Sequence, residues 1–283
     1  MSHLNDIAWQ EAKDLFKTWR DNNERKSEDV VYIWKAVLEY NLNKLGKEKQ
    51  QIIEQTCIGA LDCFRLDVAD TCVRLLNKEF PYSLRVQKYK AMIYEAQEKY
   101  GEAIEVLEDI IKADKTNSGA RKRIVAIYKA QGKNVEAIKE LTEYLRIFMT
   151  DTEAWQELSE LYLSEQDFPK AAFCVEELIL HNPHNHLLHQ RYADIKYTQG
   201  GQENIELARA YYCQALKLNP NNMRALYGLY LACCNIANSQ KSTAGKKKEA
   251  NSLSEWALTE IKQKYKEKRM KSLENCIAAL QIN

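Results

Sequence analysis

The sequence predicts an all-α fold made of repeated antiparallel helix pairs. Three observations support this prediction. Gly and Pro are scarce, at nine and four among 283 residues, alanines recur at a constant interval, and apolar residues around each alanine keep helical spacing. Few helix-breaking residues over so long a chain favour helices joined by short turns. A constant step of about 34 residues predicts that a single helix pair is repeated along the chain.

The recurring alanines set the register of the repeat. The copy that begins at Trp155 continues with Leu158, Ser159, Tyr162 and Ala171, which follows the W-x-x-L-G-x-x-Y…A pattern of the tetratricopeptide repeat. The small residues let two helices approach closely, and the large ones fill the space beside that contact. We therefore predict a set of repeat-packing residues, namely Ala69, Ala103, Ala137, Ala171, Ala208, Tyr94, Tyr128, Tyr162 and Trp155.

This register divides the chain into three parts. Residues 1–49 are predicted to form N-terminal capping helices, since an end repeat cannot leave its apolar face bare. Residues 50–222 are predicted to hold five repeats wound into a right-handed superhelix, with three extra residues in the turn of the fifth. Residues 223–283 are predicted to form C-terminal helices, with a Lys-rich loop at 238–248 and a last short helix over 270–280.

Composition excludes several classes of function. The net charge of +1 gives no general attraction to nucleic acid or to an acidic membrane. The chain lacks the roughly 20 consecutive apolar residues of a spanning helix, and its first ten residues do not read as a signal peptide. No C-x-x-C pair occurs among the eight cysteines, and no catalytic or nucleotide-binding fingerprint is present. We expect a non-catalytic protein in a reducing compartment, without a cofactor, a metal or a small-molecule substrate.

Two short clusters have an alternative interpretation. Four histidines, from His181 to His189, suggest a metal site, but they flank a turn around Pro183 and lack ligand spacing, so an inter-repeat turn is favoured. The run from Lys246 to Lys248 suggests contact with anionic lipid or nucleic acid, but a solvated loop is favoured.

The first helix of each repeat is expected to line the concave, protein-binding side of the array. Charged residues there are equally consistent with a solvated face, and both interpretations stay open. By helical spacing, the groove-facing residues are predicted to be Arg85, Lys88, Met92, Glu95, Lys122, Lys129, Gln156, Glu160, Leu163, Arg191 and Asp194.

Some stretches are more specific than the repeat itself. These stretches are QGKNVEAI (131–138), KAAFCVEEL (170–178), NPHNHLLHQRYADIKYTQGG (182–201) and QALKLNPNNMRALYGLY (214–230). They resemble the family of subunit 2 of the ER membrane protein complex. The resemblance implies a peripheral scaffold on the cytoplasmic side of the endoplasmic reticulum membrane. Such a subunit organises an insertase for tail-anchored and multi-pass membrane proteins. The implied partners are cytosolic segments of subunits 3 and 5 and the soluble subunit 8 or 9.

An alternative function is a free cytosolic adaptor for chaperones or another multiprotein assembly. Tetratricopeptide domains that bind acidic chaperone C-termini use a clamp of Lys and Asn side chains. Met92, Ala126 and Glu157 stand where such a clamp needs polar amides. The sequence therefore favours the complex subunit over the chaperone adaptor.

Overall fold

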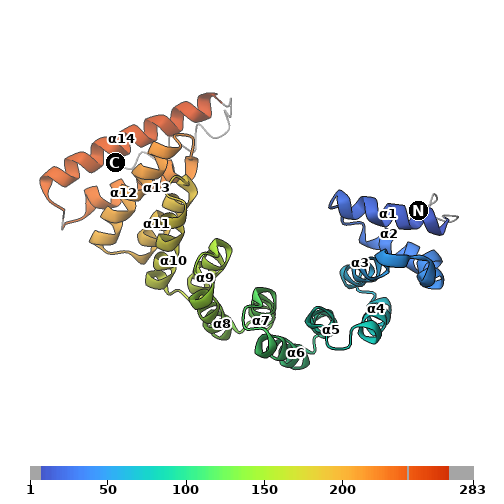
Figure 1. Ribbon diagram of the computed structural model, residues 1–283. Helices are drawn as coiled ribbons and strands as arrows, with labels where there is room; N and C mark the ends of the chain where they lie inside the picture. The colour runs from blue at the N-terminus through green and yellow to red at the C-terminus, as the bar shows by residue number, and fades with distance from the viewer. Residues whose placement is uncertain (1–7, 241, 268–283) are drawn as a thin grey trace. The chain divides into compact units, whose positions relative to one another are not determined.

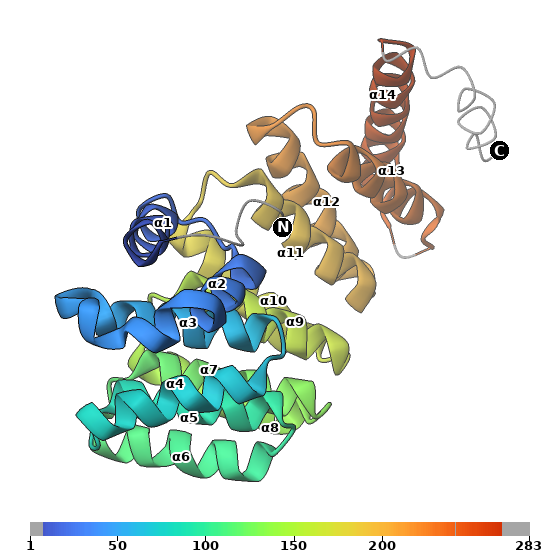
Figure 2. The same ribbon diagram turned by 90° about the vertical axis from the view of Figure 1, so that its right-hand side faces the viewer.

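The computed structural model describes residues 8–240 and 242–267. Figures 1 and 2 show a succession of antiparallel helices, and the described residues contain no strand. Within each unit, the consecutive helices from α2 to α7 and from α9 to α14 pack on one another in chain order. The predicted all-α fold of tetratricopeptide-type helix pairs is confirmed.

In the described residues after residue 48, the helices form six pairs, each with a short turn between its two members. Their bounds are α3 (Lys49–Asp62) with α4 (Leu66–Glu79), α5 (Leu84–Ala96) with α6 (Tyr100–Ala113), α7 (Ser118–Ala130) with α8 (Asn134–Ile147), α9 (Thr152–Ser164) with α10 (Phe168–His181), α11 (His186–Gln199) with α12 (Gln202–Leu218), and α13 (Met223–Asn238) with α14 (Ala244–Glu267).

The segment before these pairs is less regular than its apolar spacing suggests. It begins with α1 (Trp9–Asp21) and α2 (Ser27–Ile33), but α2 continues as a π-helical turn over Trp34–Leu38 and then as 3-10 turns over Glu39–Lys44 and Gly46–Glu48. Asn41 leaves helical geometry altogether. The change in helical pitch lets Trp34, Leu38 and Leu45 all reach the core, where they are at most 1% exposed.

An Asn or Asp side chain sets the start of several first helices. The side chains of Asn117, Asp151 and Asn222 each accept a hydrogen bond from the backbone N–H three residues later, at 3.0–3.1 Å. The side chain of Asn185 accepts a hydrogen bond from the backbone N–H of Leu187, two residues later, at 3.0 Å. These N-caps satisfy amides that a helix leaves without an internal partner. The repeat therefore fixes where its first helix begins as well as how the helix packs.

A residue with a positive φ recurs in the turn inside each of the first five pairs. It lies two places after the first helix at Phe64, Glu98, Gly132 and Gln166, with a φ of 56–70°, and one place after α11 at Gly200, with a φ of 74°. These positions are evenly spaced along the chain, at the same step as the recurring alanines. Only two of the five are glycine, although left-handed backbone is unfavourable for residues with a β-carbon.

By packing, the chain divides into two compact units, Met1–Glu140 and Leu141–Asn283. The first contains a core around Phe16, Trp34 and Leu38, with a second cluster around Leu107 and Ile124. In the second unit, the aliphatic and aromatic side chains of α11 to α14 gather in one cluster. A repeat array has only nearest-neighbour contacts, so its packing units need not coincide with its repeats.

The predicted Lys-rich loop over 238–248 is wrong in extent. Helix α13 continues to Asn238 and α14 begins at Ala244, so Lys246, Lys247 and Lys248 lie in the first turns of a helix. The carbonyl of Thr243 accepts the amide of Lys247 at 3.0 Å, which starts the helix before the lysine run. Lys246 also forms an ion pair with Glu206 of α12 at 2.6 Å. The helix predicted over 270–280 lies outside the described residues.

The predicted repeat-packing alanines occupy one place in successive second helices. Each is fully buried, at 0% exposure, namely Ala69, Ala103, Ala137, Ala171 and Ala208. The Ser159 hydroxyl of α9 donates to the Ala171 carbonyl of α10 at 3.2 Å, which shows how close the two helices come. The larger members are half-buried, and they are Tyr94, Tyr128, Tyr162 and Trp155.

Candidate protein-binding surfaces

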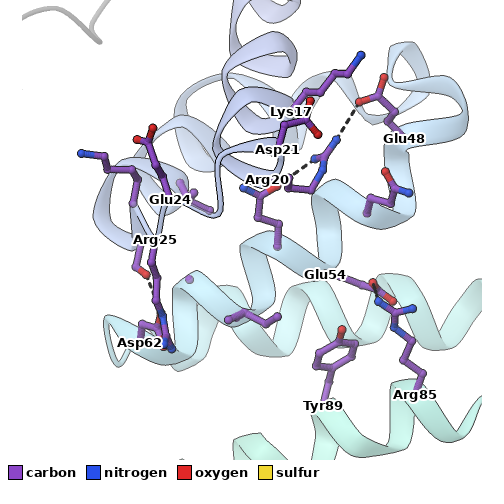
Figure 3. Close-up of a pocket in the computed structure, with 17 residues that line it drawn as sticks. Lys17, Arg20, Asp21, Glu24, Arg25, Glu48, Glu54, Asp62, Arg85 and Tyr89 are labelled. Carbon is purple, nitrogen blue, oxygen red and sulfur yellow. Dashed lines mark hydrogen bonds and ion pairs between the residues drawn. The ribbon is translucent and has the colours of Figure 1, made fainter.

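A hollow with a volume of about 730 Å³ lies in the first unit. We call it the N-terminal hollow; α1, α2, α3 and α5 contribute its walls (Figure 3). Charged and amide side chains form most of its lining, which includes Lys17, Arg20, Asp21, Glu24, Arg25, Lys26, Glu48, Gln51, Glu54, Gln55, Asp62 and Arg85.

Most charges on its walls are held by partners from another element. Arg25 places two nitrogens on the Asp62 carboxylate, at 2.5 and 2.7 Å. Arg20 of α1 donates to Glu48 at 3.1 Å and to Gln55 of α3 at 3.0 Å. These bonds tie the N-terminal helices to α3. They also fix the direction of the donors and acceptors that a bound segment would meet.

The chemistry of this lining is that of recognition. Its residues include no cysteine and no histidine, and the Ser27 hydroxyl donates to Asp62 at 2.7 Å. The Asp62 carboxylate that accepts this hydrogen bond also binds Arg25, which lowers the pKa of Asp62 and makes it a weak base. The hollow offers paired charges and amides to the side chains of another chain.

Acid–arginine pairs, one of them in the lining of the hollow, join the first helices of successive repeats. Glu54 of α3 pairs with Arg85 of α5, and Glu95 of α5 pairs with Arg123 of α7, both at 2.5 Å. Burial raises the pKa of the Glu54 and Glu95 carboxyls despite the neighbouring arginines. The carboxylates are therefore the recessed members of these pairs.

The second unit repeats this arrangement with its own residues. Glu160 of α9 pairs with Arg191 of α11 at 3.4 Å, and Asp194 of α11 pairs with Arg224 of α13 at 2.9 Å. Asp194 also accepts the Tyr212 hydroxyl of α12 at 2.6 Å. In each of the four pairs the acid precedes the arginine by 28–31 residues, about one repeat.

A second hollow, of about 510 Å³, lies over α11 in the second unit. Three predicted groove residues, Leu163, Arg191 and Asp194, line it together. The remaining lining comes from Phe168, Leu187, Gln190, Ile195, Thr198 and Arg224. This hollow combines aliphatic walls with one carboxylate and two guanidinium groups.

The other predicted groove residues are placed as follows. Lys88 and Met92 are half-buried on α5, and Met92 packs partly against the N-terminal core. On α7, Lys122 is half-buried and Lys129 is exposed. Gln156 is exposed on α9 and donates to Glu160 at 3.4 Å. The eleven residues thus lie on four first helices, α5, α7, α9 and α11, and three of them, Leu163, Arg191 and Asp194, line one hollow together.

Sequence reasoning missed the partners in these pairs and the N-terminal hollow. Glu54, Arg123 and Arg224 were not among the predicted groove residues, and neither were Arg20 and Arg25. The pairs carry a sequence signal, an acid followed about one repeat later by an arginine. The hollow carries none, because irregular turns bring α1 and α2 to α3.

The histidines around Pro183 take structural roles. His189 is 6% exposed, and its Nε2 donates to the Pro183 carbonyl at 2.8 Å. His186 lies 3.0 Å from the side-chain amides of both Asn219 and Asn222. Among the described residues no three His, Cys, Asp or Glu side chains are grouped as metal ligands.

Comparison with known proteins places the chain in a family. The family model described as the EMC2 TPR-like repeat domain matches residues 69–210. The chain is 46% identical over 291 aligned residues to ER membrane protein complex subunit 2 of Xenopus tropicalis, covering 100% of this chain and 98% of that one. The chain belongs to the family of ER membrane protein complex subunit 2. The resemblance stated from its sequence stretches is confirmed.

More distant relatives share the same region. The Dictyostelium discoideum subunit 2 is 33% identical, with 91% of this chain and 84% of that one covered. The TPR repeat protein oca3 of Schizosaccharomyces pombe is 30% identical over 67% of this chain and 69% of its own. The C-terminal part of a TPR repeat-containing protein from Cytophaga hutchinsonii has a TM-score of 0.61 at 16% identity, with 88% and 93% covered, which supports the fold alone.

Family membership makes this protein a subunit of the ER membrane protein complex with TPR-like repeats, whose partners include other subunits. It points to a non-catalytic repeat protein associated with the endoplasmic reticulum membrane. In the described part of the chain, every helix is too short or too polar to cross a bilayer.

Proposed function

We propose that this protein is a non-catalytic scaffold on the cytoplasmic side of the endoplasmic reticulum membrane. It organises subunits of an insertase for tail-anchored and multi-pass membrane proteins. The observation that carries the proposal is the 46% identity, over the whole chain, to a protein named as subunit 2 of the complex.

The partners proposed are cytosolic segments of subunits 3 and 5, together with the soluble subunit 8 or 9. The two hollows support this part of the proposal, because each offers fixed hydrogen-bonding groups on the face of the first helices. A repeat array presents this face over several helices, which suits an extended segment of another chain.

A non-catalytic role is supported by the state of the polar groups. Arg20, Arg25 and Arg85 are engaged with carboxylates of the protein itself. The thiols of Cys57 and Cys174 are buried, and burial raises the pKa of each to about 12. Such thiols stay protonated at neutral pH and are poor nucleophiles.

The test is to purify the tagged protein from gently solubilised membranes and to identify its companions by mass spectrometry. We expect a stoichiometric set of membrane subunits of the complex, including subunits 3 and 5. Alkaline carbonate is expected to release the protein from microsomes, since peripheral proteins are held by contacts with other chains.

Recovery of soluble chaperones without membrane subunits would overturn the proposal in favour of the free adaptor. Retention of the protein in the carbonate-resistant pellet would contradict the peripheral placement.

A further inference from the structure

The first helices of the second and third repeats carry an unusual concentration of positive charge. Helix α5 has three basic residues and one acid, and α7 has four basic residues and no acid. The second helix between them is the reverse, because α6 has four acids and one lysine. Charge is thus segregated by face in the first unit, while the whole chain is close to neutral.

Five of these cations share one side of the two helices, and we call this set the basic face: Arg85, Lys88, Lys122, Arg123 and Lys129. Lys88 and Lys122 occupy equivalent positions in successive repeats. The bond from Arg123 to Glu95 joins α7 to α5 directly. A β-carbon on Gly119 would lie 3.8 Å from Nζ of Lys88, so this ammonium group reaches the first turn of α7.

The carboxylates on the basic face are recessed, and one of its arginines points outward. The Arg85 side chain is 68% exposed, whereas its partner Glu54 is 16% exposed. Glu95 is 20% exposed beside Arg123, and one of its oxygens has no hydrogen-bond donor among the described residues. An approaching chain would therefore meet the cations before the acids.

The first turn of α7 adds to this field. This turn contains no acidic residue. The basic residues at or just after its end are Arg121, Lys122 and Arg123. Exposed amides at a helix N-terminus already carry partial positive charge, so the cations there are not compensated by the helix itself. A carboxylate from another chain would be stabilised by the helix N-terminus and by the neighbouring cations.

We propose that the basic face binds an acidic, carboxylate-bearing segment of a partner protein. This inference rests on the proposed function and gives the chemistry of one of its contacts. Neighbouring first helices lie roughly 10 Å apart, and Lys122 and Lys129 are two helical turns apart, again about 10 Å. A polyproline-II segment has three residues per turn and rises about 9 Å per turn, so acids at every third position lie on one face and match both spacings.

The side chains between the cations favour a peptide over a nucleic acid. Met92 is half-buried and Ala126 is exposed at the centre of the basic face, and they suit an aliphatic side chain of the segment. Tyr89, one helical turn after Arg85, is 5% exposed. Single-stranded nucleic acids are usually held by exposed aromatic rings on which bases stack, and this face offers none among its described residues.

The test uses the purified full-length chain and a short fluorescein-labelled peptide with glutamate at every third position and leucine between. Binding is followed by fluorescence anisotropy at increasing salt. The competitors are the same peptide with glutamine for glutamate, a single-stranded DNA oligonucleotide, and vesicles containing phosphatidylserine.

Two double variants make the comparison specific. Lys88→Glu with Lys122→Glu reverses two charges of the basic face. Lys133→Glu with Lys139→Glu reverses two exposed charges at the start of α8 and within it, outside that face. Circular dichroism checks that both variants keep the helical content of the natural chain.

We expect salt-sensitive binding of the glutamate peptide, weakened at least about tenfold by the first variant and less than about twofold by the second. Equal loss in both variants, equal binding of the glutamine peptide, or tighter binding of DNA or vesicles would each overturn the inference. The proposed function is tested separately by co-purification. Peptide binding without the membrane subunits would leave the inference standing and remove that function.

Discussion

At Gly228, helix α13 comes so close to α12 that no larger residue fits without movement. A β-carbon there would lie 2.3 Å from the ring of Tyr212. Tyr212 is itself 2% exposed and held by its hydroxyl on Asp194. Because both ends of the tyrosine are fixed, its ring has little freedom to move away.

We expect Gly228→Ala to lower the free energy of unfolding by about 1–3 kcal/mol through overpacking. Gly101→Ala, in α6, is the matched control, because nothing lies within 4 Å of its β-carbon. Alanine is the better helix former, so Gly101→Ala should raise stability by about 0.5–1 kcal/mol. Urea unfolding followed by circular dichroism measures both. A neutral or stabilising Gly228→Ala would show that Tyr212 can move.

Single residues also differ in whether their packing role can be predicted from the sequence. Ala171 and its equivalents stand out because each repeats at a fixed step, so their packing role could be predicted. Gly228 does not repeat, and its importance comes from Tyr212, which lies in a different helix, α12. Only the packed structure brings the two together.

At the scale of single elements, the left-handed turn inside each repeat is a built-in source of strain. Glu98 adopts a φ of 59° with a β-carbon, whereas Gly132 adopts 70° without one. Glu98 and Gly132 occupy the equivalent turn of successive repeats, so the two positions differ mainly in the presence of a β-carbon.

We predict opposite outcomes at these two turns. Glu98→Gly should raise the free energy of unfolding by about 1 kcal/mol, and Gly132→Ala should lower it by about 1 kcal/mol. Urea unfolding of the two variants against the natural chain is the measurement. Destabilisation by Glu98→Gly would mean that the entropy of the unfolded glycine outweighs the relief of strain.

The acid–arginine pairs between first helices are not equivalent. Removing Arg123 leaves Glu95 20% exposed, with an oxygen that already lacks a donor among the described residues. Removing Arg224 leaves Asp194 with hydrogen bonds from Tyr212 and Gln190.

We therefore expect Arg123→Ala to cost about 1–3 kcal/mol, as for a buried group left without its partner, and Arg224→Ala less than about 1 kcal/mol, as for an exposed pair. Chemical unfolding of the two variants in the same buffer compares them. Equal costs would indicate that neither the exposure of the arginine nor the acid's other hydrogen bonds decide the strength of the pair.

At the scale of the whole molecule, contacts in a repeat array join only neighbouring repeats. Such an array can lose structure in one region and keep it in another. The buried thiols report on each unit separately. Cys57 lies in α3 of the first unit and Cys233 in α13 of the second, and burial raises the pKa of each to about 12.

We expect both thiols to resist the thiol reagent DTNB at pH 8 in the natural chain, because a raised pKa keeps a thiol in its unreactive protonated form. In Gly228→Ala, Cys233 should react faster while Cys57 keeps its protection. Mass spectrometry of the labelled peptides identifies each site. Equal acceleration at both would show that the two units unfold as one.

The sequence by itself determined the helix pairs, the constant step between them and the family, because these depend on local spacing and on stretches of similar residues. It also placed Arg191, Asp194 and Leu163, which the structure gathers at one hollow. The tertiary structure alone decided the N-terminal hollow, the recessed acids of the basic face and the start of α14 at Ala244. The physical reason is that these features depend on side-chain contacts between different helices. Residue spacing along the chain does not specify those contacts.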